Sequence, residues 1–253
     1  MRVAFVGKGG AGKSAIAGTF ARVLARHGPA VLAVDSDPMP GLAFSLGLKV
    51  TDAGIPDDAV EERAEGEEGR RYRLRAGLSA AEAVDRYAAS GPDGIRFLQF
   101  GKLRGHSSDL FRSQLAFMQI LDELPTMSWN VIGDLPGGTR QPFFGWGEYA
   151  QTVLVVVEPS MKSLLAGRRL ARLSLTQSAP ERIVAVANKV AAADDVERVG
   201  RATGLEVIAS VPLDDELAQA ERRGRAPIDD APTCAAVVAV TSLVERLISE
   251  ERP

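Results

Sequence analysis

The stretch that decides the fold is Gly7-Lys8-Gly9-Gly10-Ala11-Gly12-Lys13-Ser14. It follows the apolar run Arg2 to Val6, which has the length of a buried strand. After Ser14 a helical pattern continues to His27-Gly28-Pro29, where glycine and then proline stop a helix. Glycines between a strand and a helix let backbone N–H groups turn inward around a phosphate, and the helix N-terminus adds a favourable dipole. The pattern therefore predicts a phosphate-binding loop in an α/β protein.

The side chains of this loop predict a nucleotide bound together with a metal ion. Lys13 is the cation expected to reach the β- and γ-phosphates, and the Ser14 hydroxyl is an expected Mg²⁺ ligand. The rest of the loop and the first helical turn hold phosphate through the backbone. The predicted nucleotide-binding residues here are Gly9, Gly10, Ala11, Gly12, Lys13, Ser14 and Ala15.

Six further apolar runs have the length of strands and alternate with longer helical patterns. This alternation indicates βαβ units, and runs that are apolar throughout indicate strands covered on both faces. We predict one domain over residues 1–253, with a mainly parallel sheet and helices on both faces. The six runs are Ala30 to Val34, Ile95 to Gln99, Asn130 to Asp134, Thr152 to Val157, Arg182 to Ala187 and Glu206 to Ala209.

The charged stretch 51–71 differs from the rest of the chain. It is rich in Asp, Glu and Gly, and its composition favours a solvated insertion without chemistry of its own. We expect an exposed loop or a ragged helix here, and a mobile one.

Composition excludes several classes of protein. The net charge of −3 argues against a protein coated with nucleic acid, although modest basic clusters occur at Arg168-Arg169 with Arg172 and at Arg222-Arg223 with Arg225. A single cysteine, Cys234, cannot form an internal disulfide, and its apolar surroundings predict a place in the core. No apolar stretch is long enough to cross a membrane, and the N-terminus lacks the pattern of a signal peptide. We expect a cytoplasmic protein.

Acidic side chains follow two of the predicted strands. Asp35 and Asp37 come at the end of the second strand, and Asp134 ends the run before Leu135-Pro136-Gly137-Gly138. Carboxylates at this end of a parallel strand lie near the phosphates and the metal. Aspartates that merely cap a helix are the alternative for Asp35 and, less so, for Asp37.

Lys8 narrows the assignment, because the second position of an ordinary phosphate-binding loop is not constrained. With Lys8, the loop resembles the deviant Walker A signature of the MinD/ParA superfamily, also called SIMIBI-class P-loop NTPases. The resemblance implies ATP as the nucleotide and a nucleotide-dependent homodimer. In the family, a lysine at the Lys8 position crosses the dimer interface to the other subunit's nucleotide, where it would act as an arginine finger does. A solvated lysine is the alternative.

The same resemblance assigns roles to six other residues. It implies that Asp37 orients or activates the attacking water, whereas Asp35 supports the Mg²⁺ site through water. Asp134 would hold Mg²⁺ through a water, and the Gly137 N–H would meet the γ-phosphate. Asn188 would hydrogen-bond the purine, while Lys189 beside it is as readily a solvated charge. Val211-Pro212-Leu213-Asp214 is similar to the family's next base-pocket loop, which brings Pro212 into the site.

The middle of the chain resembles one branch of the superfamily, the CooC-like ATPases that help to insert nickel into carbon monoxide dehydrogenase. The similar stretches are 78–87, 91–102 and 156–163. The branch has a metal-binding Cys-x-Cys pair after the Gly-Lys of the second stretch. This chain instead reads Leu103-Arg104-Gly105-His106-Ser107-Ser108 there, so thiolate metal binding is excluded at this position.

The sequence thus predicts an enzyme, a slow and partner-stimulated ATP hydrolase that works as a dimeric switch and remodels or matures an unidentified partner protein. Two alternatives stay open. One is a positioning ATPase like MinD or ParA, acting on DNA or a membrane surface, although the C-terminal residues 244–253 are too acidic for a membrane-binding helix. The other is a regulatory nucleotide-binding subunit with little turnover.

Overall fold

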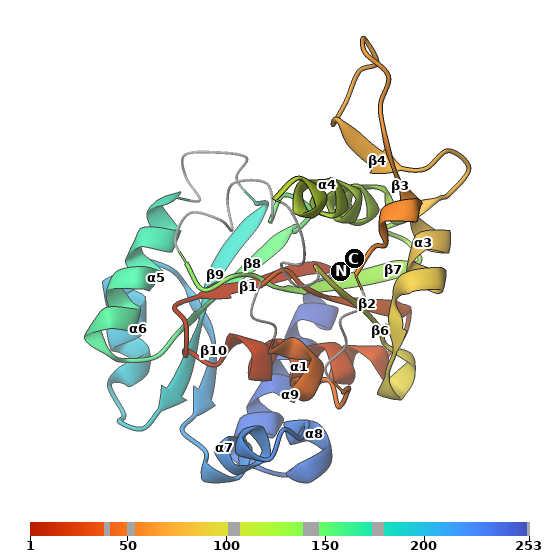
Figure 1. Cartoon of the computed structure of the whole chain (residues 1–253). Coiled ribbons are helices and arrows are strands. Elements are labelled where there is room, and N and C mark those ends of the chain that lie inside the picture. The colour runs from red at the N-terminus through yellow and green to blue at the C-terminus, as the bar shows by residue number, and fades with distance from the viewer. Residues whose placement is uncertain (38–40, 50–53, 101–106, 139–146, 174–179, 252–253) are drawn as a thin grey trace.

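The computed structural model describes residues 1–37, 41–49, 54–100, 107–138, 147–173 and 180–251, with the backbone alone at 107–111. An eight-stranded sheet in the order β10-β9-β8-β1-β7-β2-β6-β5 forms its centre (Figure 1). All neighbouring strands run parallel except β5, which pairs antiparallel with β6. The strands are β1 (Arg2–Gly7), β2 (Ala30–Asp35), β5 (Ala89–Ser90), β6 (Arg96–Gln99), β7 (Trp129–Asp134), β8 (Thr152–Val157), β9 (Arg182–Val190) and β10 (Val207–Pro212).

Helices cover both faces of this sheet, as predicted (Figure 1). One face carries α1 (Lys13–Ala25), α2 (Leu42–Ser45), α7 (Asp215–Arg222), α8 (Pro227–Asp230) and α9 (Ala235–Glu251). The other carries α3 (Ala80–Tyr87), α4 (Ser107–Glu123), α5 (Met161–Leu173) and α6 (Asp195–Thr203). None of the helices in the described residues is both long and apolar enough to span a membrane.

Strand β1 shows why the apolar runs form central strands. Every residue of β1 is buried, and alternate side chains enter opposite cores. Val3 and Phe5 pack toward α1, whereas Ala4 and Val6 pack toward the other face. The Phe5 and Phe20 rings meet edge to face, with 5.4 Å between their centroids. This packing fixes the start of α1, and therefore the loop between β1 and α1, against the sheet.

All seven predicted strands are present, but their ends differ from the prediction. β9 continues to Val190, and β10 spans Val207–Pro212 instead of ending at Ala209. Helix α1 begins at Lys13, one residue before the predicted start at Ser14. The short edge strand β5 and the 3-10 turn η2 (Pro92–Gly94) were not predicted.

The prediction of a loop or ragged helix in the charged insertion was wrong for part of it. After the 3-10 turn η1 (Asp57–Ala59), β3 (Val60–Glu62) and β4 (Tyr72–Leu74) form an antiparallel ribbon that stands over α4 (Figure 1). Val60, Tyr72 and Leu74 are buried there, so packing against α4 stabilises strands only three residues long. Residues 51–53 lie outside the described part.

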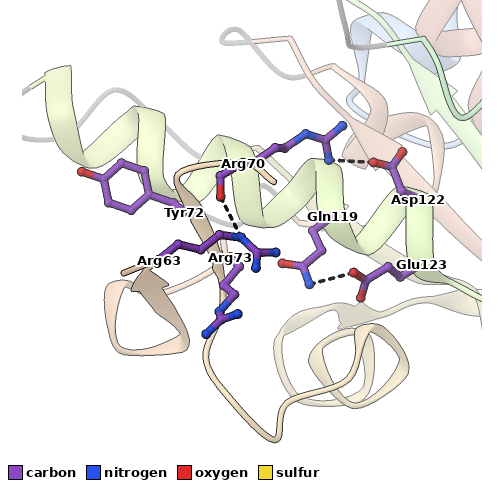
Figure 2. A pocket seen from close by; sticks show the side chains of 7 residues that line it. All are labelled: Arg63, Arg70, Tyr72, Arg73, Gln119, Asp122 and Glu123. Atoms are coloured by element: carbon purple, nitrogen blue, oxygen red, sulfur yellow. Dashed lines mark hydrogen bonds and ion pairs between the residues drawn. The ribbon is translucent and has the colours of Figure 1, made fainter. Parts of the chain in front are cut away.

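An ion pair and a hydrogen bond fasten the ribbon to α4 around a small charged cavity (Figure 2). Arg70 bonds Asp122 of α4 at 2.6 Å, and the Leu74 N–H donates to Gln119 at 2.7 Å. Arg63 and Arg73, which also line the cavity, pair with glutamates of the ribbon itself. Because each arginine has an acidic partner, this cavity is a structural clasp between the ribbon and α4.

Candidate nucleotide-binding site

Five parallel strands end at the same edge of the sheet and bring most of the predicted site together. The phosphate loop follows β1, and Asp35, Asp134 and Asn188 end or nearly end β2, β7 and β9. Strand β8 adds Glu158, which directly follows it. The parallel registers of β1 with β7 and β8, and of β2 with β7, place these ends side by side.

The loop backbone requires glycine at specific positions. Gly10 and Gly12 have φ angles of 82° and 88°, in the left-handed region that side chains disfavour. A Cβ on Gly12 would lie 2.3 Å from the Asn188 amide nitrogen, and one on Gly7 would lie 2.4 Å from the Val156 carbonyl oxygen. Gly12 also brings no side chain to cap α1, so the N–H groups of the first helical turn are left for an anion.

Lys13 is a buried cation that forms no salt bridge within the described residues. Its side chain is 7% exposed. A Cβ on Gly137 would lie 3.7 Å from the Lys13 ammonium and 3.0 Å from the Gly9 nitrogen, so the loop after β7 touches the phosphate loop. Gly137 therefore lies where its predicted contact with a γ-phosphate needs it. A buried ammonium that no salt bridge satisfies is costly, and a bound phosphate would offset that cost.

Asp134 is the buried carboxylate beside this lysine. Its Oδ2 accepts a hydrogen bond from the Ser14 hydroxyl at 2.5 Å, while its Oδ1 is buried and has no hydrogen-bond partner in the part of the chain that the structure describes. Burial, and next the charge of Asp35, raise the pKa of Asp134 to about 7. Hard oxygen donors of this kind suit Mg²⁺, and a cation would satisfy the unpartnered oxygen and reverse the pKa shift. The residues present therefore fit a magnesium ion.

The Asp35 carboxylate lies within the same buried cluster but is engaged by the backbone. Its Oδ1 accepts the Asp37 N–H at 3.0 Å, and its Oδ2 accepts the N–H groups of Gly41 and Leu42 at 3.1 and 3.0 Å. Burial raises its pKa to about 6, against the effect of these bonds. The capping alternative is therefore realised in this structure, and the predicted role of Asp35 through water at the magnesium site stays a prediction.

Asp37 lies at the mouth of this cluster. Its side chain is half-buried, and its charge is among those that raise the pKa of Asp134. The bond from its N–H to Asp35 fixes the turn on which it stands. Asp37 is thus near the expected metal and partly open to solvent, as a residue that positions water needs to be.

Asn188 and Pro212 meet in a narrow pocket beside α1. The Asn188 amide donates to the Ala11 carbonyl oxygen at 2.7 Å, which ties β9 to the phosphate loop. The pocket is formed by α1, the end of β9 and the segment from β10 into α7. Sequence reasoning missed the contribution of α7. The lining residues are Gly12, Ala15, Ile16, Asn188, Lys189, Pro212, Leu213, Asp214, Leu217, Ala218, Glu221 and Ala236.

The side chain of Lys189 contacts the phosphate loop although it is 41% exposed, so it is a partly solvated charge that also has partners in the site. Its ammonium donates to the Gly10 carbonyl oxygen at 2.8 Å and pairs with Glu158 at 3.2 Å. Lys189 has a φ angle of 56°, which a non-glycine residue adopts at a cost. Glu158 was not predicted. Its position directly after a buried strand beside β1 is the signal that could have found it.

Lys8 lies on the rim of the loop. Its side chain is half-exposed, and the ammonium donates to the Gly9 carbonyl oxygen at 3.1 Å. Burial alone would raise the pKa of Glu158, but bonds from Ser160 and Lys189 and the charge of Lys8 hold it below its usual range. Lys13 thus faces inward, whereas Lys8 stands at the surface of the same loop.

Comparison with known proteins assigns this site to a family. The model of the CobQ/CobB/MinD/ParA nucleotide binding domain matches residues 3–228. The chain belongs to this family. It is 26% identical to the carbon monoxide dehydrogenase accessory protein CooC of Rhodospirillum rubrum, over 98% of this chain and 97% of that protein. It is also 26% identical to an uncharacterized ATP-binding protein of Methanocaldococcus jannaschii, over 89% and 90% of the two chains.

Solved structures agree on the fold of this MinD/ParA-family chain. A ParA family ATPase from Chlorobium tepidum has a TM-score of 0.73 and 18% identity, with 97% of this chain and 98% of that chain covered. MinD from Pyrococcus horikoshii, complexed with Mg-ADP, has a TM-score of 0.72 and 15% identity, with 97% and 95% covered. The predicted family and P-loop fold are confirmed. At the level of the family, so is an ATPase that binds ATP or ADP with Mg²⁺.

One further group of side chains in this MinD/ParA-family chain has the composition of a metal site. Ligand atoms of Asp214, Glu216 and Cys234 lie within 4.8 Å of one another. The Asp214 oxygens, however, already accept N–H groups at the start of α7 and from Ala236. Cys234 is buried, as predicted. His106 and the stretch 101–106 lie outside the described residues.

Proposed function

We propose that this chain is a Mg-ATP-hydrolysing switch that dimerises around bound nucleotide and remodels or matures a partner protein. The nucleotide part of this proposal rests on two buried charged groups at the edge of the sheet that lack a full set of partners. Within the described residues, Lys13 is buried without a salt bridge, and the Asp134 Oδ1 is buried without a hydrogen-bond partner. A triphosphate with Mg²⁺ supplies the opposite charge to each of them.

The residues divide the work of hydrolysis among themselves. Lys13 and the N–H groups of the loop hold the β- and γ-phosphates, and Gly137 donates its N–H at the γ-phosphate. Ser14 would bind Mg²⁺ directly and Asp134 would hold it through water, which would supply positive charge to the phosphate oxygens. Asp37 orients the attacking water and accepts its proton.

The pocket beside α1 takes the base. Asn188 offers both a donor and an acceptor, which suits an adenine edge, although its amide also bonds Ala11. Pro212 and Leu213 supply apolar surface at its mouth, where Leu213 is 59% exposed.

The position of Lys8 supports dimerisation. Its charge stands at the rim of the loop, and within its own subunit the ammonium bonds only a carbonyl oxygen among the described residues. The phosphates of a second subunit would give it a buried anionic partner at the transferring group. Association would then depend on ATP, and hydrolysis would end it.

One relative supports the kind of partner that we propose. CooC of R. rubrum is an accessory protein to carbon monoxide dehydrogenase, and the similarity extends over nearly the whole chain. This chain has no Cys-x-Cys pair, so we place the work in the switching of a partner protein and not in thiolate metal transfer. Of the two alternatives, a regulatory subunit with little turnover predicts different responses to the variants below. A positioning ATPase would respond to them as the proposed switch does, and would differ by binding DNA or a membrane surface.

The test measures mass by size-exclusion light scattering, and phosphate release, for the wild type, Asp37→Asn and Lys8→Ala with Mg-ATP. The wild type should dimerise with ATP and relax after hydrolysis. Asp37→Asn keeps size and some hydrogen bonding, so it should bind ATP and stay dimeric while turnover falls about 10²-fold or more. Lys8→Ala should bind ATP and remain monomeric.

Lys49→Ala is the matched control, because Lys49 is an exposed lysine away from the loop. It should dimerise and hydrolyse ATP as the wild type does. If Asp37→Asn stays monomeric at saturating Mg-ATP, or if Lys8→Ala dimerises normally, the switch model is wrong for this chain. A nucleotide-bound monomer with negligible turnover would favour the regulatory subunit.

A further inference from the structure

One surface of α5 collects positive charge that nothing in the described chain neutralises. The helix contains no acidic residue, and none of its four cations forms an ion pair within the described residues. Apolar side chains are exposed among them. We call this surface the α5 face, and it consists of Met161, Lys162, Leu165, Arg168, Arg169 and Arg172.

The spacing of these residues makes a single stripe. They recur at one-, three- and four-residue intervals, which is the repeat of one side of a helix, and they span roughly 17 Å at 1.5 Å per residue. The opposite side of the helix buries Leu164, Leu170 and Ala171 in the core. Figure 1 shows α5 on the outside of the molecule beside α6, on the same face of the sheet as the β3–β4 ribbon but near the opposite edge. The α5 face is therefore open to a partner.

Neighbouring arginines show what a solvated face looks like in this protein. On α6, Arg201 pairs with Glu197 one turn away at 2.8 Å. Just after α7, Arg225 pairs with Asp230 at 3.0 Å. These pairs neutralise exposed arginines locally, as is usual on helix surfaces. The α5 face lacks such pairs, so it differs from the other basic cluster that the sequence contains.

The arrangement costs the isolated chain some stability. Arg168 and Arg172 are like charges one turn apart, which repel by a few tenths of a kcal/mol. Met161 and Leu165, also one turn apart, leave 67% and 53% of their surface exposed. Nothing in the described fold compensates either feature. A bound surface with acidic groups beside apolar ones would compensate both.

We propose that the α5 face docks an acidic, amphipathic helical segment of a partner protein. Met161 and Leu165 would cover its apolar side chains, and the arginine forks would take its carboxylates in bidentate pairs. The inference rests on the proposed function in one respect, because it gives the partner protein of that proposal a surface and a chemistry.

Composition and shape favour a protein segment over the other anionic surfaces. The net charge of −3 opposes every anionic partner alike at long range, so the choice among them rests on the composition of the α5 face itself. No aromatic side chain on the α5 face is available to stack on a base. A membrane-surface helix needs a free apolar side, but that side of α5 is already buried in the core.

The position of the α5 face next to the nucleotide site suits a switch. Helix α5 starts three residues after Glu158, whose carboxylate pairs with Lys189. Lys189 in turn bonds the Gly10 carbonyl oxygen of the phosphate loop. A partner held on the α5 face is thus linked through Glu158 and Lys189 to the phosphate loop, where the bound nucleotide would change during turnover.

The test uses fluorescence anisotropy with nucleotide-free protein and a labelled peptide of glutamate and leucine patterned as an amphipathic helix. The variant reverses three charges of the face, Arg168→Glu with Arg169→Glu and Arg172→Glu. The control reverses Arg71, Arg201 and Arg225, which are 66%, 68% and 67% exposed, and it changes the net charge equally. Peptide affinity should fall at least about tenfold in the first variant and about twofold or less in the control.

Three further arms keep the test decisive. A peptide with serine in place of leucine should bind at least about threefold more weakly, because Met161 and Leu165 lose their contacts. If the triple variant does not fold, the milder change Arg169→Ala alone should still weaken peptide binding. Equal losses in both triple variants, or tighter binding of duplex DNA or phosphatidylglycerol vesicles through the α5 face, would overturn the proposal. Because no nucleotide is present, the result does not depend on whether the chain dimerises with ATP.

Discussion

Two buried cations lie near opposite ends of the same helix and differ in how the protein satisfies them. Lys13 begins α1, is 7% exposed and has no ion pair among the described residues. Arg22, in the last turn of α1, is 2% exposed and donates to Asp229 through two nitrogens, to Asp93 and to the Leu46 carbonyl oxygen. The comparison separates a charge that the fold completes from a charge that the fold leaves open for a ligand.

The electrostatics around each cation follow this difference. At the Arg22 end, hydrogen bonds to Asp229 and Asp93 raise the pKa of the guanidinium although its burial opposes this. At the Lys13 end, two carboxylates lie close together, and the pKa of Asp134 is raised to about 7. Buried charge without partners is unfavourable until something binds. The incompletely paired charges around Lys13 therefore lower the stability of the fold, whereas the paired charge of Arg22 at the other end of α1 does not.

Removing the charge of Lys13 should give the largest effect, and that effect should be on the affinity for ATP. Lys13→Ala deletes the one buried cation that the loop itself offers to the β- and γ-phosphates. We expect ATP affinity to fall about 10³-fold, roughly 4 kcal/mol, so that calorimetry detects no binding at ordinary concentrations. The free energy of unfolding without nucleotide should change by less than about 1 kcal/mol, because Lys13 has no ion pair to lose. An unchanged ATP affinity in Lys13→Ala would show that the loop is not a phosphate-binding loop.

Removing the completed charge should do the opposite. Arg22→Ala leaves Asp93 and Asp229 without their shared partner, but these carboxylates are 23% and 48% exposed and can be rehydrated. We therefore expect a loss of about 2–3 kcal/mol in the free energy of unfolding, at or below the lower end for a broken buried pair. ATP affinity of the folded fraction should not change. Arg26→Ala is the control, because Arg26 is 47% exposed and should cost less than about 1 kcal/mol.

Urea denaturation, with and without saturating Mg-ATP, measures both quantities for Arg22→Ala on the same samples. An Arg22→Ala protein as stable as the wild type would show that the completed charge contributes nothing. A loss of ATP affinity in the folded protein would show that the two ends of α1 are coupled, and the division between them would then fail.

The nucleotide edge could be predicted from sequence because its signals are local. Strand, glycines, Lys13 and Ser14 are contiguous, and Asp134 and Asn188 each follow a recognisable apolar run. Parallel strands bring such ends together whatever lies between them. Only the order of the runs along the chain was needed to place these side chains.

The contacts that sequence reasoning missed are long-range or depend on packing. Arg22 and Asp229 are 207 residues apart, and Lys189 reaches Gly10 across 179 residues, with no periodicity to announce either contact. The β3–β4 ribbon has strands too short for an alternating pattern, and its buried side chains are defined only by the presence of α4. Asp35 illustrates a third reason, because a capping aspartate and a metal-site aspartate have the same sequence signal.

The smallest expected effect is a dependence on pH of the stability that Asp93 contributes near Arg22. Burial alone would raise the pKa of Asp93, but the bonds from Arg22 and Arg26 outweigh burial and lower the pKa below its ordinary value of 3.8. A carboxylate with a depressed pKa in the folded protein contributes stability that is complete above the unfolded value and is lost as pH falls through the folded value. The contribution of Asp93 should thus be constant from neutral pH down to about 5, and should disappear as pH falls below about 4 toward the lowered pKa.

Asp93→Asn isolates this contribution, because asparagine tolerates the φ angle of 57° that Asp93 adopts. In urea denaturation at a series of pH values, the stability difference between wild type and Asp93→Asn should be constant above about pH 5 and shrink at lower pH. The control is Asp85→Asn, since Asp85 is 64% exposed and 3.7 Å from Arg96, so its difference from wild type should be small at every pH. A difference for Asp93→Asn that stays constant down to pH values well below the ordinary pKa would mean that the carboxylate charge contributes nothing there. The cluster around Arg22 would then stabilise the fold through packing and neutral hydrogen bonds, and the contrast with Lys13 would no longer be one of charge.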